Sequence, residues 1–281
     1  ENQVTLLGQD AGIFKKNGIV LENFGTNGAG ETLQAVISGS ADIGIGMGTA
    51  GAMRAFVRGA PVRVLTPAFT GTGDLYWYVK ADSPIKSIKD ANGHTIAYST
   101  HGSSTNGVVL AFVKQYKLDQ AKPVAMGGPS ANITAVMSGQ VDIGWAAPPF
   151  GLDQLDKGDI RMIATGNDAS VFKGQTVRVN LANANWLKDH QDIVNRYMKA
   201  YRETVDFMYH DPKAIEIYSS WLKITPAKAK RTRDNFFKWP AIDPDKIVGL
   251  DQIVNDAVDL KFTSKPLTKE QLADLIRIPP R

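Results

Sequence analysis

The chain has 281 residues, a formal net charge of +4 and no cysteine. This length suffices for one large or two medium domains, and 43% hydrophobic with 21% charged residues is typical of globular proteins. The mild charge, without a run of lysine and arginine, argues against nucleic-acid binding. The lack of cysteine excludes disulfides and thiolate chemistry, and no apolar segment approaches the about 18 residues of a membrane-spanning helix.

The chain opens with a predicted helix followed by a predicted strand. Val4, Leu7 and Phe14 fall on one helical face, and residues 19–24 read as a strand. Because an α/β lobe usually begins with a strand, we expect a further strand upstream of Glu1, together with a leader that this sequence does not include.

Residues 27–46 and 127–146 form a repeat with an offset of 100 positions (131 − 31 = 100). Each copy reads as a glycine-rich loop, a short apolar helix, a glycine that can end the helix, and a buried strand. The seven residues that recur are Ala35, Val36, Ser38, Gly39, Asp42, Ile43 and Gly44. An ordinary helix-to-strand connection is one explanation. Two copies at a fixed distance fit two similar α/β lobes better, with a binding cleft between them.

Residues 46–51 match the dinucleotide-binding pattern G-x-G-x-x-G, and they follow a predicted strand and open a predicted helix. That fingerprint also requires an acidic residue at the end of the next strand. The next strand, residues 62–69, has none, so we expect no nucleotide here. What remains is a helix start with small residues and exposed N–H groups that could face a ligand.

The chain should cross between the lobes twice. The loop and strand of residues 71–82 form the first crossover, and the strand of residues 176–181 brings the chain back. We therefore assign residues 1–79 and 176–281 to lobe one and residues 80–175 to lobe two. The remainder of lobe one is predicted to be helical.

Two stretches of lobe two are candidate ligand contacts. Residues 99–107 join a strand to a helix, and Ser103 or Ser104 should cap that helix where its free N–H groups point outward. This is either a solvated cap or an anion cradle. Trp145 stands at the tip of its strand, where open α/β sheets bind ligands, although it could also be a core residue. Pro149 is expected to begin the following helix.

The sequence offers little catalytic machinery. Its histidines lack metal-ligand spacing, and neither a nucleophile elbow nor a phosphate-binding loop is present. His101 beside Ser103 is a suggestive pairing, but nothing else supports a dyad. We expect no catalytic residue, no metal and no cofactor.

Several motifs resemble one known family, the solute-binding proteins of ABC importers. The similarity is greatest to the nitrate/sulfonate/taurine branch, which is related in fold to thiamine-pyrimidine synthases. The motifs are GIFKKNGI at 12–19, GSADIGIG at 39–46, GAPVRVL at 59–65, SPIKSIKDANGHTIA at 83–97, GSSTN at 102–106 and GQVDIGW at 139–145.

The resemblance implies an α/β fold of the two-lobed periplasmic-binding-protein type (type II), with two open sheets joined by two hinge strands. It also implies a small ligand closed between the lobes and a partner permease with a cytoplasmic ATPase. The location would be periplasmic, or extracytoplasmic with a lipid anchor, and we expect a monomer. The alternatives are an enzyme on the same fold and a sensing domain from a regulator. The synthase branch relies on a cysteine-rich motif and an active-site histidine, and the lack of cysteine counts against that chemistry.

The site loops of the resembling family map onto five stretches of this sequence. The ligand-binding residues that we predict there are Gly28, Gly30, Thr32, Met47, Thr49, Phe69, Thr70, Thr72, Gly102, Ser103, Ser104, Thr105, Trp145 and Pro148. Arg178, in the returning strand, is a further candidate that could pair with an acid group of the ligand, or else be a solvated hinge residue. Because these stretches supply hydroxyls, N–H groups and aromatic rings but few cations, we expect an organic anion with an apolar body. An aromatic carboxylate or an organosulfonate fits this description.

Overall fold

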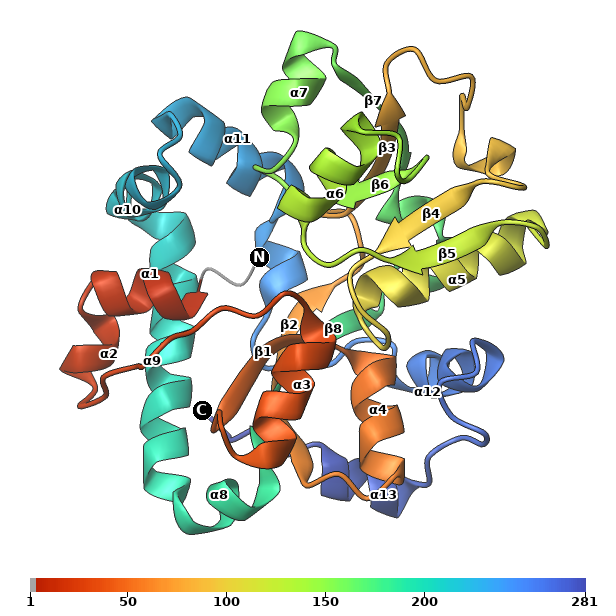
Figure 1. Ribbon diagram of the computed structural model, residues 1–281. Helices are drawn as coiled ribbons and strands as arrows, with labels where there is room; N and C mark the ends of the chain where they lie inside the picture. Colours follow the sequence, from red (N-terminus) through yellow and green to blue (C-terminus); the bar gives the residue numbers. More distant parts are fainter. Residues whose placement is uncertain (1–3) are drawn as a thin grey trace.

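The computed structural model describes residues 4–281 and shows the two-lobed α/β fold of periplasmic binding proteins (Figure 1). The sheet of lobe one has the strand order β1–β8–β2, and β8 runs antiparallel to both neighbours. Its strands are β1 (Ile43–Gly48), β2 (Val62–Thr70) and β8 (Thr176–Asn183).

The strands of lobe two form a second sheet, of order β6–β3–β7, and a parallel pair, β4–β5. A bridge from Ile96 to Ile143 joins the pair to the edge of the sheet. The strands are β3 (Tyr76–Lys80), β4 (Thr95–Tyr98), β5 (Lys122–Ala125), β6 (Gly144–Ala146) and β7 (Ile160–Thr165).

The two copies of the sequence repeat lie in different sheets. Helix α3 (Ala29–Ser38) leads into β1, and helix α6 (Pro129–Met137) leads into β6. Gly39 and Gly139, which follow these helices, both have φ of 77°, a left-handed conformation that favours glycine. The repeat therefore marks equivalent units of the two lobes.

Helices cover both faces of the lobe-one sheet (Figure 1). On β8, Val179 and Leu181 pack on one face against the core of helices α4 and α12, while Ala182 belongs to the core on the other face. That second core is dominated by the long helix α9, whose Val194, Met198 and other apolar side chains recur at helical spacing.

The helices of lobe one besides α3 are α1 (Val4–Asp10), α2 (Ile13–Lys16), α4 (Thr49–Val57), α8 (Ala184–Asp189), α9 (Gln191–His210), α10 (Lys213–Leu222), α11 (Pro226–Phe236), α12 (Leu250–Asp259) and α13 (Lys269–Leu275). Those of lobe two besides α6 are α5 (Ser104–Tyr116) and α7 (Leu152–Lys157). Within residues 4–281, no helix combines the length and the apolar character needed to cross a membrane.

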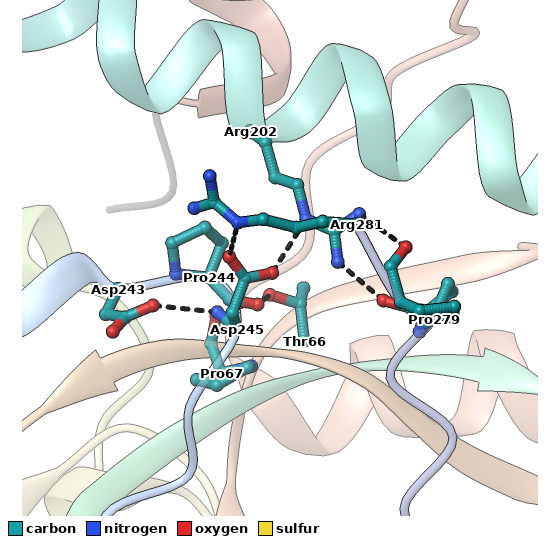
Figure 2. Close-up of polar contacts among 9 residues, drawn as sticks. Thr66, Pro67, Arg202, Asp243, Pro244, Asp245, Pro279 and Arg281 are labelled. Carbon is teal, nitrogen blue, oxygen red and sulfur yellow. Dashed lines mark hydrogen bonds and ion pairs between the residues drawn. The ribbon is translucent and has the colours of Figure 1, made fainter.

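The C-terminal segment covers the outer edge of β2. The N–H of Arg277 donates to the carbonyl of Val64 over 2.8 Å. Beyond it, Arg202 of α9 binds both the carboxylate of Asp245, at 2.7 Å, and the carbonyl of Pro279, at 2.5 Å (Figure 2). These contacts protect an edge that would otherwise offer free backbone groups for pairing.

Three local predictions are wrong. Residues 19–24 form no strand, because their backbone joins none of the sheets within residues 4–281, and Val20 and Phe24 are 79% and 61% exposed. Pro149 does not begin a helix, since α7 begins at Leu152 after Gly151 in a left-handed conformation. Strand β3 belongs to the lobe-two sheet, so residues 76–79 lie with lobe two rather than lobe one. The remaining domain boundaries stay predictions. The strand expected upstream of Glu1 lies outside the described residues.

Candidate functional site

A cleft of about 920 Å³ is lined by loops from both lobes. Lobe one contributes the segment 26–29 and Thr32, and lobe two contributes Ser99, residues 103–105 and Trp145, among others. The same hollow continues along lobe one as a groove between residues 19–25 and β1. Only the part between the lobes brings residues of both repeat units together, and we take this part as the candidate site.

The start of α5 forms one wall of the cleft. Ser103 caps the helix, because its Oγ accepts a 3.1 Å hydrogen bond from the N–H of Asn106. Oγ1 of Thr105 accepts a 2.9 Å hydrogen bond from the N–H of Ser99 and also contacts Oγ of Ser103 at 2.9 Å. The predicted cap is thus confirmed at Ser103, but the hydroxyls of Ser103 and Thr105 are used within the loop. The hydroxyl of Ser104 and the N–H groups of Ser104 and Thr105 have no hydrogen bond within residues 4–281, so they remain for a ligand.

The start of α3 faces this wall from lobe one. The N–H of Gly30 donates a 2.9 Å hydrogen bond to Oγ1 of Thr100. A Cβ atom at Gly28 would lie 2.8 Å from Cγ2 of Thr100, so glycine permits the close approach of the two loops. Oγ1 of Thr32 lies 2.6 Å from Oγ1 of Thr26. Gly28 and Thr32 line the cleft, and Gly30 lies at the contact between the lobes.

The glycine-rich stretch after β1 forms a second contact between the lobes. A Cβ atom at Gly48 would lie 2.6 Å from the carbonyl oxygen of Gly102, and one at Gly51 would also collide with Gly102. Met47 is buried in the lobe-one core, and Oγ1 of Thr49 donates a 2.7 Å hydrogen bond to the carbonyl of Thr176. Met47, Thr49 and Gly102 therefore do not line the cleft, because the start of α4 packs directly on the loop before α5.

The residues near the hinge that we predicted as ligand contacts do not line the cleft, and all of them except Thr70 are buried. Arg178 and Asp74 are 3% and 0% exposed and form an ion pair that links β8 to the segment before β3. The guanidinium of Arg178 also lies 4.5 Å from the ring centre of Phe69. Oγ1 of Thr70 lies 3.0 Å from Oγ1 of Thr176, and Thr72 is fully buried. Alternation along β8 turns Arg178 toward the α9 side of the sheet, so it is neither a solvated residue nor part of the cleft lining.

Trp145 lines the cleft although it is only 2% exposed. Its indole N–H donates a 3.2 Å hydrogen bond to the carbonyl of Gly127, which fixes the ring. The side chain of Asn132 holds the same loop through a 2.9 Å hydrogen bond to the carbonyl of Gly128. Pro148 is buried behind the strand and is absent from the lining, whereas the neighbouring Phe150 reaches the cleft.

Sequence reasoning missed several residues of the cleft, namely Ser99, Gly128, Pro129 and Phe150. Gly128 and Pro129 could have been found, because residues 127–130 correspond to residues 27–30 in the repeat, where Gly28 and Gly30 were predicted to bind. Ser99 lies in the candidate stretch 99–107 but was not named as a ligand contact, and nothing in the sequence marks Phe150.

Residues 3–215 match the family described as NMT1/THI5 like. The chain belongs to this family. A curated relative is 21% identical over 238 residues, the 4-amino-5-hydroxymethyl-2-methylpyrimidine phosphate synthase of Uromyces fabae. That match spans 78% of this chain and 66% of the relative, so the chain covers just under two thirds of the relative's length.

Two solved structures of alkanesulfonate- and sulfonate-binding proteins share the fold of this NMT1/THI5-like chain. SsuA from Xanthomonas axonopodis pv. citri, bound to MOPS, is 19% identical, with a TM-score of 0.80 over 99% of this chain and 95% of that protein. The periplasmic aliphatic sulphonate-binding protein SsuA of Escherichia coli is 18% identical, with a TM-score of 0.76 over 100% and 90% of the two chains. Both likenesses establish the fold.

The cleft of this NMT1/THI5-like protein is uncharged where the lobes meet. Among the described residues that line the whole hollow, none is a lysine, arginine or histidine, and the two carboxylates, Glu22 and Asp42, belong to the groove in lobe one. No cluster of metal-ligating side chains occurs within residues 4–281. Nδ1 of His101 lies 3.1 Å from the hydroxyl of Tyr98, while the hydroxyl of Ser103 serves the helix cap, so these two residues do not form the suggested dyad. The site is equipped to bind through neutral hydrogen-bond donors and an aromatic ring.

Proposed function

We propose that this protein is the extracytoplasmic solute-binding component of an ABC importer. The main supporting observation is that the start of α3 in lobe one and the start of α5 in lobe two meet across one cleft, and residues of both repeat units line that cleft. A ligand between them would contact both lobes, so it would favour the closed arrangement, and a permease could distinguish closed from open protein. The partners would be a membrane permease and its ATPase, and the protein would act as a monomer in the periplasm or on a lipid anchor.

The chemistry of the cleft supports an organic anion with an apolar body as the ligand. The N–H groups in the first turn of α5 and the hydroxyl of Ser104 would hold the acid group, since helix N-termini attract anions without a cationic side chain. The apolar body would lie against Trp145 and Phe150. We favour an organosulfonate over an aromatic carboxylate, because both similar binding proteins are named for sulfonates.

A thermal-shift screen tests this proposal. Alkanesulfonates, MOPS and benzoates are each added to the purified protein, and a ligand at 100 times its Kd should add about 2.7 kcal/mol to the free energy of unfolding. Hits are then titrated by calorimetry against wild type and Ser104→Ala. Ser104 is the suitable probe because Ser103 and Thr105 hold the loop. If none of these organic anions stabilises the protein at millimolar concentration, the proposed ligand class is contradicted.

An enzyme on the same fold is the second candidate, because the curated relative is a pyrimidine phosphate synthase. The absence of cysteine from all 281 residues and the engagement of His101 with Tyr98 weigh against it. Mass spectrometry would distinguish the two functions. A binding protein releases its ligand chemically unchanged. If incubation of the protein with the ligand yields a compound of different mass, the enzyme is favoured.

A further inference from the structure

Two helices from different lobes carry matching charges on facing surfaces. Helix α7 belongs to lobe two, where Leu155 packs against the core of Tyr76 and Tyr78. Helix α11 belongs to lobe one, where Ala229 is fully buried in the α9 core. The two helices lie side by side at the junction of the lobes (Figure 1).

Two basic side chains of α11 pair with two acidic side chains of α7 in the same order along the helices. Lys228 of α11 forms an ion pair with Asp153 of α7, and Nη1 of Arg231 lies 3.1 and 3.0 Å from the two carboxylate oxygens of Asp156. Both acids are three positions apart on α7 and both bases are three positions apart on α11, so each pair occupies one face of its helix. One helix must therefore keep both its position and its rotation relative to the other for both pairs to exist.

We propose that Asp153, Asp156, Lys228 and Arg231 form a clasp that holds the two lobes in the closed arrangement. Separation of α7 from α11 would break both pairs together, whereas motion within either lobe would leave them intact. The clasp sets the balance between open and closed protein even without a ligand. This proposal rests on the proposed function in one respect only, namely that the two lobes move relative to each other.

The energy of the clasp suits a reversible switch. Lys228 is 21% exposed, but the other three side chains are between 44% and 58% exposed, so water and salt weaken the attraction. Exposed ion pairs contribute little each. Two of them can bias an equilibrium by about fivefold without locking it. A ligand with a larger preference for the closed form would still control the outcome.

The experiment exploits the absence of cysteine from the chain. Asn185→Cys in lobe one and Gln140→Cys in lobe two introduce two exposed thiols for spin labels, and neither position belongs to the clasp. Distance distributions are recorded without ligand in the labelled wild type, in Lys228→Gln/Arg231→Gln, and in the charge-swapped variant Asp153→Lys/Asp156→Arg/Lys228→Asp/Arg231→Asp. Lys230→Gln is the matched control. It also removes a positive charge from α11, but the partner of Lys230 is Asp234 of the same helix, so no contact between the lobes is lost.

The neutral double variant should shift the ratio of closed to open protein about fivefold toward open, and 1 M salt should shift the wild type in the same direction. The swapped variant should recover the wild-type ratio, and Lys230→Gln should not change it. If the swapped variant fails to melt cooperatively, Asp153→Lys/Lys228→Asp takes its place. Any of three results would contradict the proposed clasp. The double variant could leave the ratio unchanged, the swapped variant could fail to recover it, or Lys230→Gln could shift it equally. Failure of the ligand screen would contradict the proposed ligand class and leave this ratio unaffected.

Discussion

The backbone N–H of Gly30 donates a 2.9 Å hydrogen bond to Oγ1 of Thr100, and the two residues belong to different lobes. Gly28, at the N-cap of α3, offers no side chain to cap that helix. A threonine from the opposite lobe thus satisfies one of the free N–H groups at the helix start. We therefore predict that this hydrogen bond forms when the lobes close and breaks when they open.

Thr100→Val should weaken ligand binding by about fivefold, because a neutral hydrogen bond of about 1 kcal/mol is lost only in the closed form. Thr100→Ser keeps the hydroxyl and should bind as the wild type does. Calorimetric titration with the best organosulfonate from the screen measures both. Equal affinities of the valine and serine variants would show that this contact does not contribute to closure.

Gly51→Ala should also oppose closure. The added methyl group would collide with the backbone of Gly102 in the other lobe, which cannot move aside as a flexible side chain can. We expect ligand affinity to fall at least tenfold, about 1.4 kcal/mol. Gly25→Ala is the control, since a Cβ atom there meets nothing within 4 Å and the residue lies in the lobe-one groove, outside the part between the lobes. Retention of full affinity by Gly51→Ala would mean that the ligand-bound protein does not use this contact.

Arg178→Ala should reduce stability strongly, because it leaves Asp74 as a buried charge without its guanidinium. Loss of one partner of a buried pair typically costs about 3–5 kcal/mol, which urea unfolding would measure. The double variant Asp74→Leu/Arg178→Met should recover much of that loss. If the folded double variant binds ligand as tightly as wild type, Arg178 acts in the hinge alone. A loss of affinity there would instead support the ligand role first considered for it.

Asp142, the aspartate of the second repeat, should make stability depend on acid pH. Partial burial disfavours its ionised form, but hydrogen bonds from the N–H and hydroxyl of Thr95, with His94 nearby, outweigh this and lower the pKa of Asp142. A lowered pKa in the folded protein gives stability that is present above the unfolded value of 3.8 and lost as pH falls through the folded value.

Asp142→Asn should therefore be less stable than wild type at pH 7, by at most about 1 kcal/mol because the carboxylate is partly exposed. The difference should shrink below about pH 4. Urea unfolding at several pH values tests this. A difference that stays constant from pH 7 to pH 3 would contradict the assignment.

The two-lobed fold could be predicted from sequence because the repeat and the family motifs record it directly. Gly39 and Gly139 mark equivalent helix ends, and Ser103 was recognisable as a cap because serine, strand and helix stand in a local order. The site was harder to predict. The sequence places Phe69 and Arg178 near the crossovers but does not show which face of the sheet they occupy. Arg178 faces away from the cleft and pairs with Asp74, and this pairing could not be read from the sequence because Asp74 lies 104 positions away, at the other crossover.

Small-angle X-ray scattering with and without ligand tests directly whether the ligand is captured by closure of the two lobes. If the lobes close on the ligand, the best organosulfonate or aromatic carboxylate from the screen, at saturation, should reduce the radius of gyration of the wild-type protein. The radius of gyration of Gly51→Ala should fall by a smaller amount when that variant is saturated with the same ligand. Calorimetry in the same buffer verifies that the sites are saturated. If a wild-type protein that is open before ligand is added then shows no change in its radius of gyration, capture by lobe closure is contradicted.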